Sequence, residues 1–258
     1  MSKGFDKRIV SYERLHSIKP EDFQILIDAI SPKIGEVILD AMCGYGAVGK
    51  AVLEKEPKSE VYFLDESSVQ LERAIANVQN VDNDHFILDS LPHDNFQDDF
   101  FDTVVIKMGL HEVSLTKHLE ILKELKRILK PDGKVVVWDI MLNDSTQELF
   151  QAIIRKKDEL AGFDLLMEER YFFREDEFIK NAKWAGFENR KDYHTISYRF
   201  SSLQRLEQEL GADREKLKQL NEFIRDRFNE DLKEKLNYED LGDDIRFTVT
   251  KKIYILKE

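Results

Sequence analysis

Three acidic residues each end a short run of apolar residues in the first third of the sequence. Asp40, Asp65 and Asp89 follow runs rich in valine, isoleucine, leucine and phenylalanine, which predict strands. In open α/β sheets, ligands bind outside the carboxyl ends of the strands. We therefore expect the three carboxylates to lie along one ligand-binding edge of a sheet, where each accepts hydrogen bonds from a different polar group.

A glycine-rich segment follows the first of these acids. Gly44 and Gly46 allow a ligand to approach the backbone, and the helix expected after them offers free N–H groups. Asp40 would repel a pyrophosphate but hold an ammonium group. Asp65 stands 19 residues after Gly46, the spacing typical of an acid that binds ribose hydroxyls, and Asp89 could accept from the amine of a base. An amine, a ribose and an adenine together indicate S-adenosylmethionine.

The elements that would position these acids alternate along the chain. Continuous apolar runs separated by amphipathic stretches predict parallel strands covered on both faces. The strands are expected at residues 37–39, 61–64, 86–88, 103–106, 135–138, 193–198 and 247–256. The helices are expected near residues 21–30, 67–80, 115–129, 145–160 and 174–185, with a further helix that follows the turn at residues 44–49 and ends near residue 56. This order predicts an α/β fold with a doubly wound, Rossmann-like sheet of seven strands, the last of them antiparallel.

The sequence also suggests three regions. Residues 1–33 are expected to form a helical lead-in or cap, and residues 34–200 with 247–258 the core. Between the sixth and seventh strands, residues 201–246 form a helical insert that leaves the sheet at its ligand-binding edge. We expect a lid over the acceptor pocket, while a solvated helical pair or a dimer contact remain alternatives.

Composition narrows the possible partners. The 258 residues carry 39 basic and 51 acidic side chains, a net charge of −12, which offers no basic footprint for nucleic acid or anionic lipid. Cys43 is the single cysteine, no Cys/His spacing resembles a metal site, and no segment resembles a signal peptide or membrane span. We expect a cytoplasmic protein, monomeric or homodimeric, without a metal, that acts on a small molecule and binds neither nucleic acid nor membranes.

Taken together, the motifs resemble those of the class I S-adenosylmethionine-dependent methyltransferases, in particular the UbiE-type group that acts on small molecules. The resemblance covers roughly residues 34–198 and the final strand. The segments that carry it are 37–46, 64–65, 89–92, 101–105, 125–134 and 185–187. Two features depart from the pattern: His93 stands where an aromatic residue often follows Leu-Pro, and the insert is longer than the usual hairpin connection.

This resemblance assigns roles to the residues at the strand ends. S-adenosyl-L-methionine is the implied cofactor, with Gly44 and Gly46 beside its methionine part and Asp65 on its ribose. The full set of expected cofactor-binding residues is Asp40, Gly44, Gly46, Asp65, Glu66, Asp89, Ser90, Leu91, Lys107 and Met108. The implied reaction transfers a methyl group to an oxygen, nitrogen or carbon atom.

His111 is the candidate general base, since it lies just beyond the fourth strand and titrates near neutrality. A structural role, as a helix cap or a cofactor contact, is the alternative. Substrate contacts are expected from Tyr12 and His16, if their segment folds over the cofactor, and from Tyr171, Phe172 and Arg174. For Tyr12 and His16 the alternative is an exposed lead-in segment. For the residues at 171–174 the alternative is that the aromatic side chains pack in the core.

Two other functions remain open from the sequence. The glycines at positions 44, 46 and 49 formally match the G-x-G-x-x-G pattern of nicotinamide oxidoreductases, although Asp40 argues against a dinucleotide. A protein that binds the cofactor without turnover is the second alternative, because methyl transfer requires no obligatory catalytic side chain.

Overall fold

The computed structural model describes residues 19–93 and 95–258, so Tyr12 and His16 lie outside the described residues. Two compact units divide this part of the chain. The sheet unit comprises residues 19–139, 177–195 and 252–258, and the helix-rich unit comprises residues 140–176 and 196–251. Among the described residues, no helix has the length and apolar character needed to cross a bilayer.

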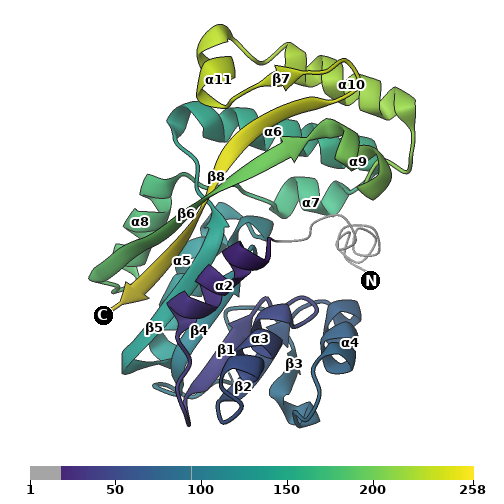
Figure 1. Cartoon of the computed structure of the whole chain (residues 1–258). Helices are drawn as coiled ribbons and strands as arrows, with labels where there is room; N and C mark the ends of the chain where they lie inside the picture. The colour runs from purple at the N-terminus through teal and green to yellow at the C-terminus, as the bar shows by residue number, and fades with distance from the viewer. Residues whose placement is uncertain (1–18, 94) are drawn as a thin grey trace. The chain divides into compact units, whose positions relative to one another are not determined.

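Five parallel strands form the centre of the sheet, in the order β3-β2-β1-β4-β5 (Figure 1). Their bounds are β1 Val37–Ala41, β2 Glu60–Asp65, β3 Phe86–Leu88, β4 Phe101–Lys107 and β5 Leu129–Ile140. β8 (Ile245–Lys257) follows β5 in the sheet order, and β6 (Asn189–Ser201) lies at the edge beyond it. The arrow of β8 opposes those of β5 and β6 (Figure 1), so the predicted doubly wound fold with an antiparallel last strand is confirmed.

The described sheet has one strand more than the seven predicted. The additional strand, β7 (Glu239–Asp240), has two residues and pairs antiparallel with β8. Two residues are too few to produce a recognisable alternation of apolar and polar side chains. β7 lies within residues 201–246, the predicted insert, together with α9 (Ser202–Gln208), α10 (Arg214–Arg225) and α11 (Glu230–Lys235).

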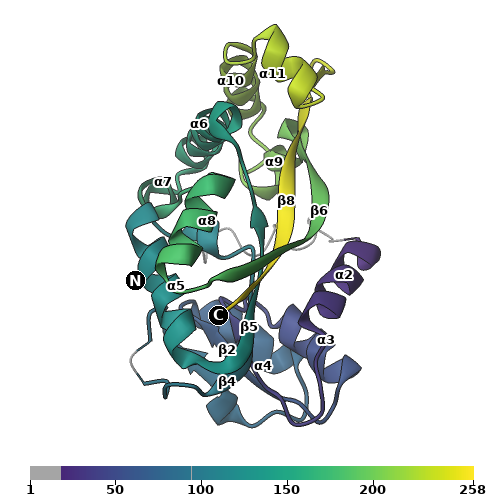
Figure 2. The same ribbon diagram turned by 90° about the vertical axis from the view of Figure 1, so that its left-hand side faces the viewer.

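Helices cover both faces of the sheet unit. Figure 2 shows α5 (Leu115–Ile128) and α8 (Glu175–Trp184) on one side and α2 (Pro20–Ile30) and α3 (Ala47–Lys55) on the other. This arrangement explains why the central strands are continuously apolar: Val104, Val105 and Ile106 of β4 are all completely buried. α4 (Ser68–Asn77) follows β2 and is capped by Ser67, whose hydroxyl accepts a hydrogen bond from the backbone N–H of Gln70.

β5 begins six residues earlier than predicted. Residues 131–133, which precede the predicted strand, belong to β5 as an irregularity. Phe101 pairs with Leu129 and Thr103 with Lys134, so two steps on β4 correspond to five on β5. The three additional residues form a bulge, and beyond it the register continues without a shift to the end of β4.

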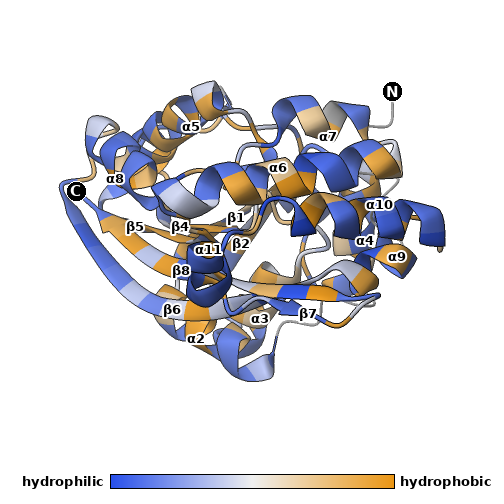
Figure 3. Cartoon of the chain, turned by 90° about the horizontal axis from the view of Figure 1, so that it is seen from above, coloured by the Kyte–Doolittle hydropathy of each residue, from blue (hydrophilic) through white to orange (hydrophobic). Residues whose placement is uncertain are grey.

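The helix-rich unit has its own apolar core. α6 (Asp144–Ala161) contributes Phe150, and the rings of Phe200 and Phe247 stack with their centroids 4.6 Å apart. In Figure 3, α6 carries hydrophobic and hydrophilic residues side by side, as expected of a helix with one buried face. α7 (Asp164–Glu169) was not predicted, because six residues are too few for a helical period to stand out.

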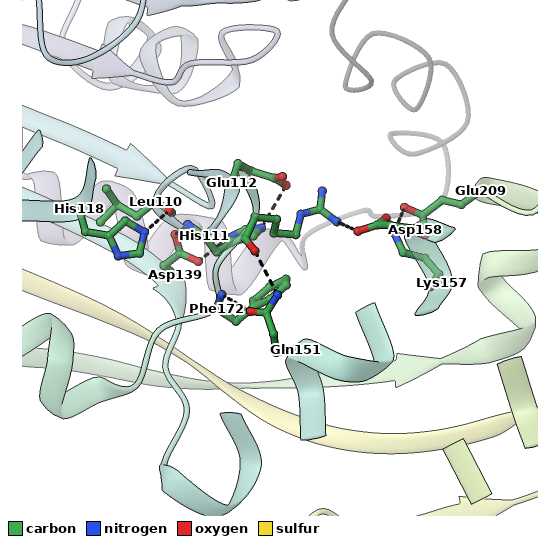
Figure 4. A network of polar contacts seen from close by, with 11 residues as sticks. Leu110, His111, Glu112, His118, Asp139, Gln151, Lys157, Asp158, Phe172 and Glu209 are labelled. Carbon is green, nitrogen blue, oxygen red and sulfur yellow. Dashed lines mark hydrogen bonds and ion pairs between the residues drawn. The ribbon is translucent and has the colours of Figure 1, made fainter. Parts of the chain in front are cut away.

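The helix-rich unit also contains a buried ionic cluster. The Lys157 ammonium lies 2.5 Å from Asp158 and 2.8 Å from Glu209, and Arg170 lies 2.9 Å from the other oxygen of Asp158 (Figure 4). All four residues are buried. Because each charge has an opposite charge within hydrogen-bonding distance, the pairing offsets the cost of removing these groups from water.

Candidate functional site

The carboxyl ends of the parallel strands bring most of the predicted cofactor residues to one edge of the sheet unit. Asp40 of β1 pairs with Val105 of β4. Lys107, two residues further along β4, pairs with Trp138 of β5. The backbone N–H of Asp89 donates to the carbonyl of Asp65, which joins the end of β3 to that of β2. The edge predicted from the sequence therefore exists as one row of residues.

The glycine loop lies against the acid at the end of β2. Gly44 and Gly46 have φ values of 55° and 74°, in the left-handed region that favours glycine. The N–H of Gly44 donates to Oδ2 of Asp65 at 2.8 Å, and Oδ1 of Asp65 accepts from the N–H of Ser67. These bonds place the Asp65 carboxylate between the glycine loop and the start of α4, where a ribose would be held.

Asp40 is a buried acid whose charge is costly in this structure. Its Oδ2 accepts a hydrogen bond of 2.8 Å from the N–H of Gly49, which attaches α3 to the end of β1. Burial raises the pKa of Asp40 to about 7, although the Gly49 hydrogen bond and the charge of Lys107 oppose the shift. A cation placed nearby would favour the ionised carboxylate, as expected for a residue that faces an ammonium or sulfonium group.

The segment after β3 is organised by Asp89. Its Oδ1 accepts from the N–H of Ser90, and its Oδ2 lies 3.0 Å from Nδ1 of His93. The Ser90 hydrogen bond, with His93, lowers the pKa of Asp89, so the carboxylate is ionised at neutral pH. Leu91 is buried, Glu66 is exposed, and His93 replaces the usual aromatic residue by packing its ring edge-on against Phe96.

Gln70 lies beside the glycine loop and was not among the residues expected from the sequence. It lies in the first turn of α4 and is 6% exposed, and among the described residues no hydrogen-bond donor reaches its Oε1. Its Nε2 is 3.8 Å from the position that a Cβ on Gly44 would occupy. A buried amide oxygen beside the glycine loop and Asp65 fits the hydroxyl groups of an adenosyl cofactor. No single-sequence signal marks this residue.

His111 is held by two acids. It lies in the short 3-10 helix η2 (Leu110–Glu112), and its Nδ1 is 2.6 Å from Oδ1 of Asp139 (Figure 4). Oδ2 of Asp139 accepts from the His111 backbone N–H at 3.3 Å, while Nε2 lies 3.2 Å from Glu112. Burial disfavours the protonated ring, but the charges and hydrogen bonds of Asp139 and Glu112 prevail and raise the pKa of His111.

Asp139 was also missed, although the sequence contains its signal. It follows the fifth apolar run, as Asp40, Asp65 and Asp89 follow the first three, and it is completely buried. The neighbouring His118 differs from His111: its Nε2 lies 2.8 Å from the carbonyl of Leu110, and burial lowers its pKa. His118 is therefore neutral near pH 7, donates from Nε2 to that carbonyl, and has a structural contact with the backbone.

Lys107 is the last residue of β4, and Met108 follows it. Burial lowers the pKa of Lys107, while the negative charges of Asp40 and Asp139 act in the opposite direction. Both carboxylates therefore interact electrostatically with the Lys107 ammonium. Across residues 19–93 and 95–258, no hydrogen bond or ion pair to the Lys107 side chain is found. Met108 has a φ of 56°, and its N–H extends the ladder by donating to the carbonyl of Trp138.

The predicted substrate residues within the described chain belong to the helix-rich unit. Phe172 is 3% exposed, its backbone is bonded to the amides of Gln147 and Gln151, and its ring meets Phe150 edge-on. These contacts place Phe172 in the packed interior of that unit. Tyr171 is partly exposed. Arg174 is ion-paired with two surface acids, Asp144 and Asp176.

Comparison with known proteins identifies relatives by sequence. The profile of a family described as a methyltransferase domain matches residues 38–133. The ubiquinone/menaquinone biosynthesis C-methyltransferase UbiE of Ruegeria sp. (strain TM1040) is 30% identical over 182 residues, which cover 64% of this chain and 72% of that protein. The demethylmenaquinone methyltransferase of Staphylococcus aureus (strain JH9) is 35% identical over 145 residues, covering 53% of this chain and 55% of that protein.

Solved structures share the fold. The YcgJ protein of Bacillus subtilis superposes with a TM-score of 0.77 at 15% identity, covering 93% of this chain and 99% of that one. At this identity the similarity concerns the fold alone.

Proposed function

Because this chain belongs to the UbiE-type class I S-adenosylmethionine-dependent methyltransferases, we propose that it methylates a hydroxylated aromatic small molecule with His111 as the general base. The methyl donor is S-adenosyl-L-methionine and the acceptor is a small molecule. Membership of this family removes the alternative of a nicotinamide oxidoreductase. The observation that carries the proposal is the buried contact between His111 and Asp139.

The His111–Asp139 pair has the arrangement of a general base with its orienting acid. A short contact of 2.6 Å fixes the proton on Nδ1, because an ionised carboxylate can only accept. In the neutral form of the ring Nε2 carries no proton, and because the pKa of His111 is raised this form becomes populated as pH increases. Nε2 then accepts the proton of the acceptor, and the Asp139 charge stabilises the imidazolium that forms. Glu112 lies beside Nε2 and is placed to take part in passing that proton to solvent.

The cofactor residues of the sheet unit support binding of the methyl donor. Asp65 and Gln70 would hold the ribose, Asp89 the adenine, and Asp40 the positively charged end, with the glycine loop alongside. S-adenosylmethionine, when bound, supplies a methyl group on a cationic sulfur that keeps the bonding electron pair when the methyl leaves. The remaining work for the protein is to orient the acceptor and remove its proton.

Two arguments favour a hydroxylated aromatic acceptor over an amine. The relatives described above are named for methylation in quinone biosynthesis, and one of them for methylation at carbon. A hydroquinone carries an acidic hydroxyl, which a histidine of raised pKa can deprotonate, whereas a neutral amine acceptor already has a free lone pair. The acidic composition further supports an enzyme that does not act on nucleic acid, and we propose that it works in the cytoplasm as a monomer or homodimer.

Labelled methyl donor and a panel of acceptors test this proposal. We expect transfer to 2-prenyl-1,4-naphthohydroquinone and to other phenols but not to its dimethyl ether. His111→Gln should lose at least about a hundredfold in kcat while binding S-adenosylhomocysteine like the wild type. His118→Gln is the matched control, because it replaces a buried histidine nearby and keeps a donor for the Leu110 carbonyl. If both variants lose activity equally, or amines are the preferred acceptors, the proposal is wrong.

A further inference from the structure

We propose that Lys107 binds the oxyanion of the acceptor, so that the preferred acceptors are molecules whose hydroxyl group ionises on the enzyme. This inference rests on the proposed function and names a second residue that touches the acceptor. Sequence resemblance placed Lys107 beside the cofactor only. The structure adds the relation of its side chain to the charged groups around it.

The position of Lys107 follows from the register of three strands. It is the last residue of β4, and it pairs with Trp138, the residue before Asp139. On the other side, Asp40 of β1 pairs with Val105, two residues before Lys107 and therefore on the same face of the sheet. Lys107 thus stands at the ligand-binding edge between the cofactor acid and the His111–Asp139 pair.

The nearby acids have other hydrogen-bond donors. Both oxygens of Asp139 are engaged by His111, one by the ring and one by the backbone N–H. Oδ2 of Asp40 accepts from Gly49. The Lys107 ammonium has three N–H donors, and within the described residues none of them has a hydrogen-bonded acceptor or an ion-pair partner. A partly buried cation with unused donors at a ligand-binding edge favours an anionic ligand group.

An acceptor oxyanion satisfies these requirements together with His111. Three residues separate Lys107 from His111, and Asp139 influences the pKa of both. The acceptor O–H bond breaks, its proton passes to Nε2 of His111, and the electron pair stays on oxygen as an anion that Lys107 neutralises. Charge is balanced in this step, because the imidazole gains the positive charge that compensates the new oxyanion. The carboxylate of the cofactor is the competing anion for Lys107.

Variants of Lys107 in the full-length chain test the assignment. Lys107→Met removes the charge and keeps much of the length, whereas Lys107→Arg keeps the charge. Lys134→Met is the matched control, because Lys134 is also a partly buried lysine with a lowered pKa. It pairs with Thr103, at the end of the regular β4–β5 pairing that is opposite to Lys107. Activity with 2-prenyl-1,4-naphthohydroquinone should fall at least about fiftyfold in kcat for Lys107→Met and less than about fivefold for Lys107→Arg and Lys134→Met.

Binding of a phenolate provides a readout that does not depend on turnover. 4-Nitrophenol absorbs differently as phenol and as phenolate, so its ionisation can be followed on protein saturated with S-adenosylhomocysteine. We expect the wild type and Lys134→Met to stabilise the phenolate, which shifts its titration to lower pH by about one unit or more. Lys107→Met should abolish the shift, while its affinity for S-adenosylhomocysteine changes less than about threefold.

The outcomes separate the two proposals. If the wild type methylates the hydroquinone and Lys107→Met does so equally well, the role of Lys107 is overturned while the proposed function stands. If the wild type fails to methylate the hydroquinone but stabilises the phenolate through Lys107, the proposed acceptor fails and the oxyanion site stands. If the phenolate is not stabilised, or if Lys107→Met mainly weakens S-adenosylhomocysteine, Lys107 serves no oxyanion and the inference is wrong.

Discussion

Asp40→Asn should make the protein more stable at alkaline pH and weaken its hold on the cofactor. The asparagine amide oxygen can still accept the hydrogen bond from the N–H of Gly49, so the attachment of α3 to β1 is kept. The variant removes only the ability to ionise. Since Asp40 is buried, that ability is costly in the folded chain.

The magnitude follows from the pKa of the carboxyl group. Burial raises it from 3.8 to about 7, and each unit corresponds to about 1.4 kcal/mol, so full ionisation of Asp40 costs the fold about 4 kcal/mol. The folded state binds the proton more tightly than the unfolded state. The stability that comes from this tighter proton binding by Asp40 is therefore fully present below pH 3.8 and is lost as pH rises to 7. About 3 kcal/mol of this loss falls between pH 5 and pH 8.5.

Urea denaturation of both proteins at several pH values measures this effect. The stability of Asp40→Asn relative to the wild type should increase by about 3 kcal/mol between pH 5 and pH 8.5 and then level off. Asp132→Asn, which removes an exposed carboxylate, should show no such increase. Affinity for S-adenosylmethionine should fall at least about tenfold, because a charge-assisted contact is lost. Parallel stability curves for Asp40→Asn and the wild type would refute the argument that Asp40 is a costly buried acid.

Three further substitutions probe other parts of the structure. Asp139→Asn removes the charge that raises the pKa of His111, so the pH at which activity rises should move downward and kcat should fall at least about tenfold; an unchanged pH–rate profile would contradict the pairing. Gly49→Ala places a Cβ 2.2 Å from the buried ring of Phe63 and should cost about 1–3 kcal/mol of unfolding free energy in urea, whereas a neutral effect would mean that the ring relocates freely. Glu209→Ala removes the carboxylate that contacts the buried Lys157 and should lower stability by about 3–5 kcal/mol; a loss below about 1 kcal/mol in thermal denaturation would show that the cluster is not a buried ion-pair network.

Local sequence patterns were sufficient where a residue's role depends on its own strand or helix. The apolar runs located the strands, and the acids after them were correctly expected to share one edge of the sheet, because side-chain periodicity and the position of a strand end are local properties. Asp65 and the glycine loop do lie together, with Gly44 donating to the Asp65 carboxylate. Short or irregular elements were missed for the same reason: β7 and α7 are too short for their periodicity to be recognised, and the bulge in β5 depends on its pairing with β4.

The sequence alone therefore determined the doubly wound fold, the family resemblance, the acidic edge and the candidacy of His111. Only the tertiary structure decided that Asp139 holds the ring of that histidine, that Gln70 turns a buried amide toward the glycine loop, and that Lys107 stands among acids already bonded to other groups. These relations join residues distant in sequence or depend on which donors neighbouring groups have already engaged. Strand register decides which distant residues meet, and burial decides which donors and acceptors are left without water. Neither property can be read from a single local segment of sequence.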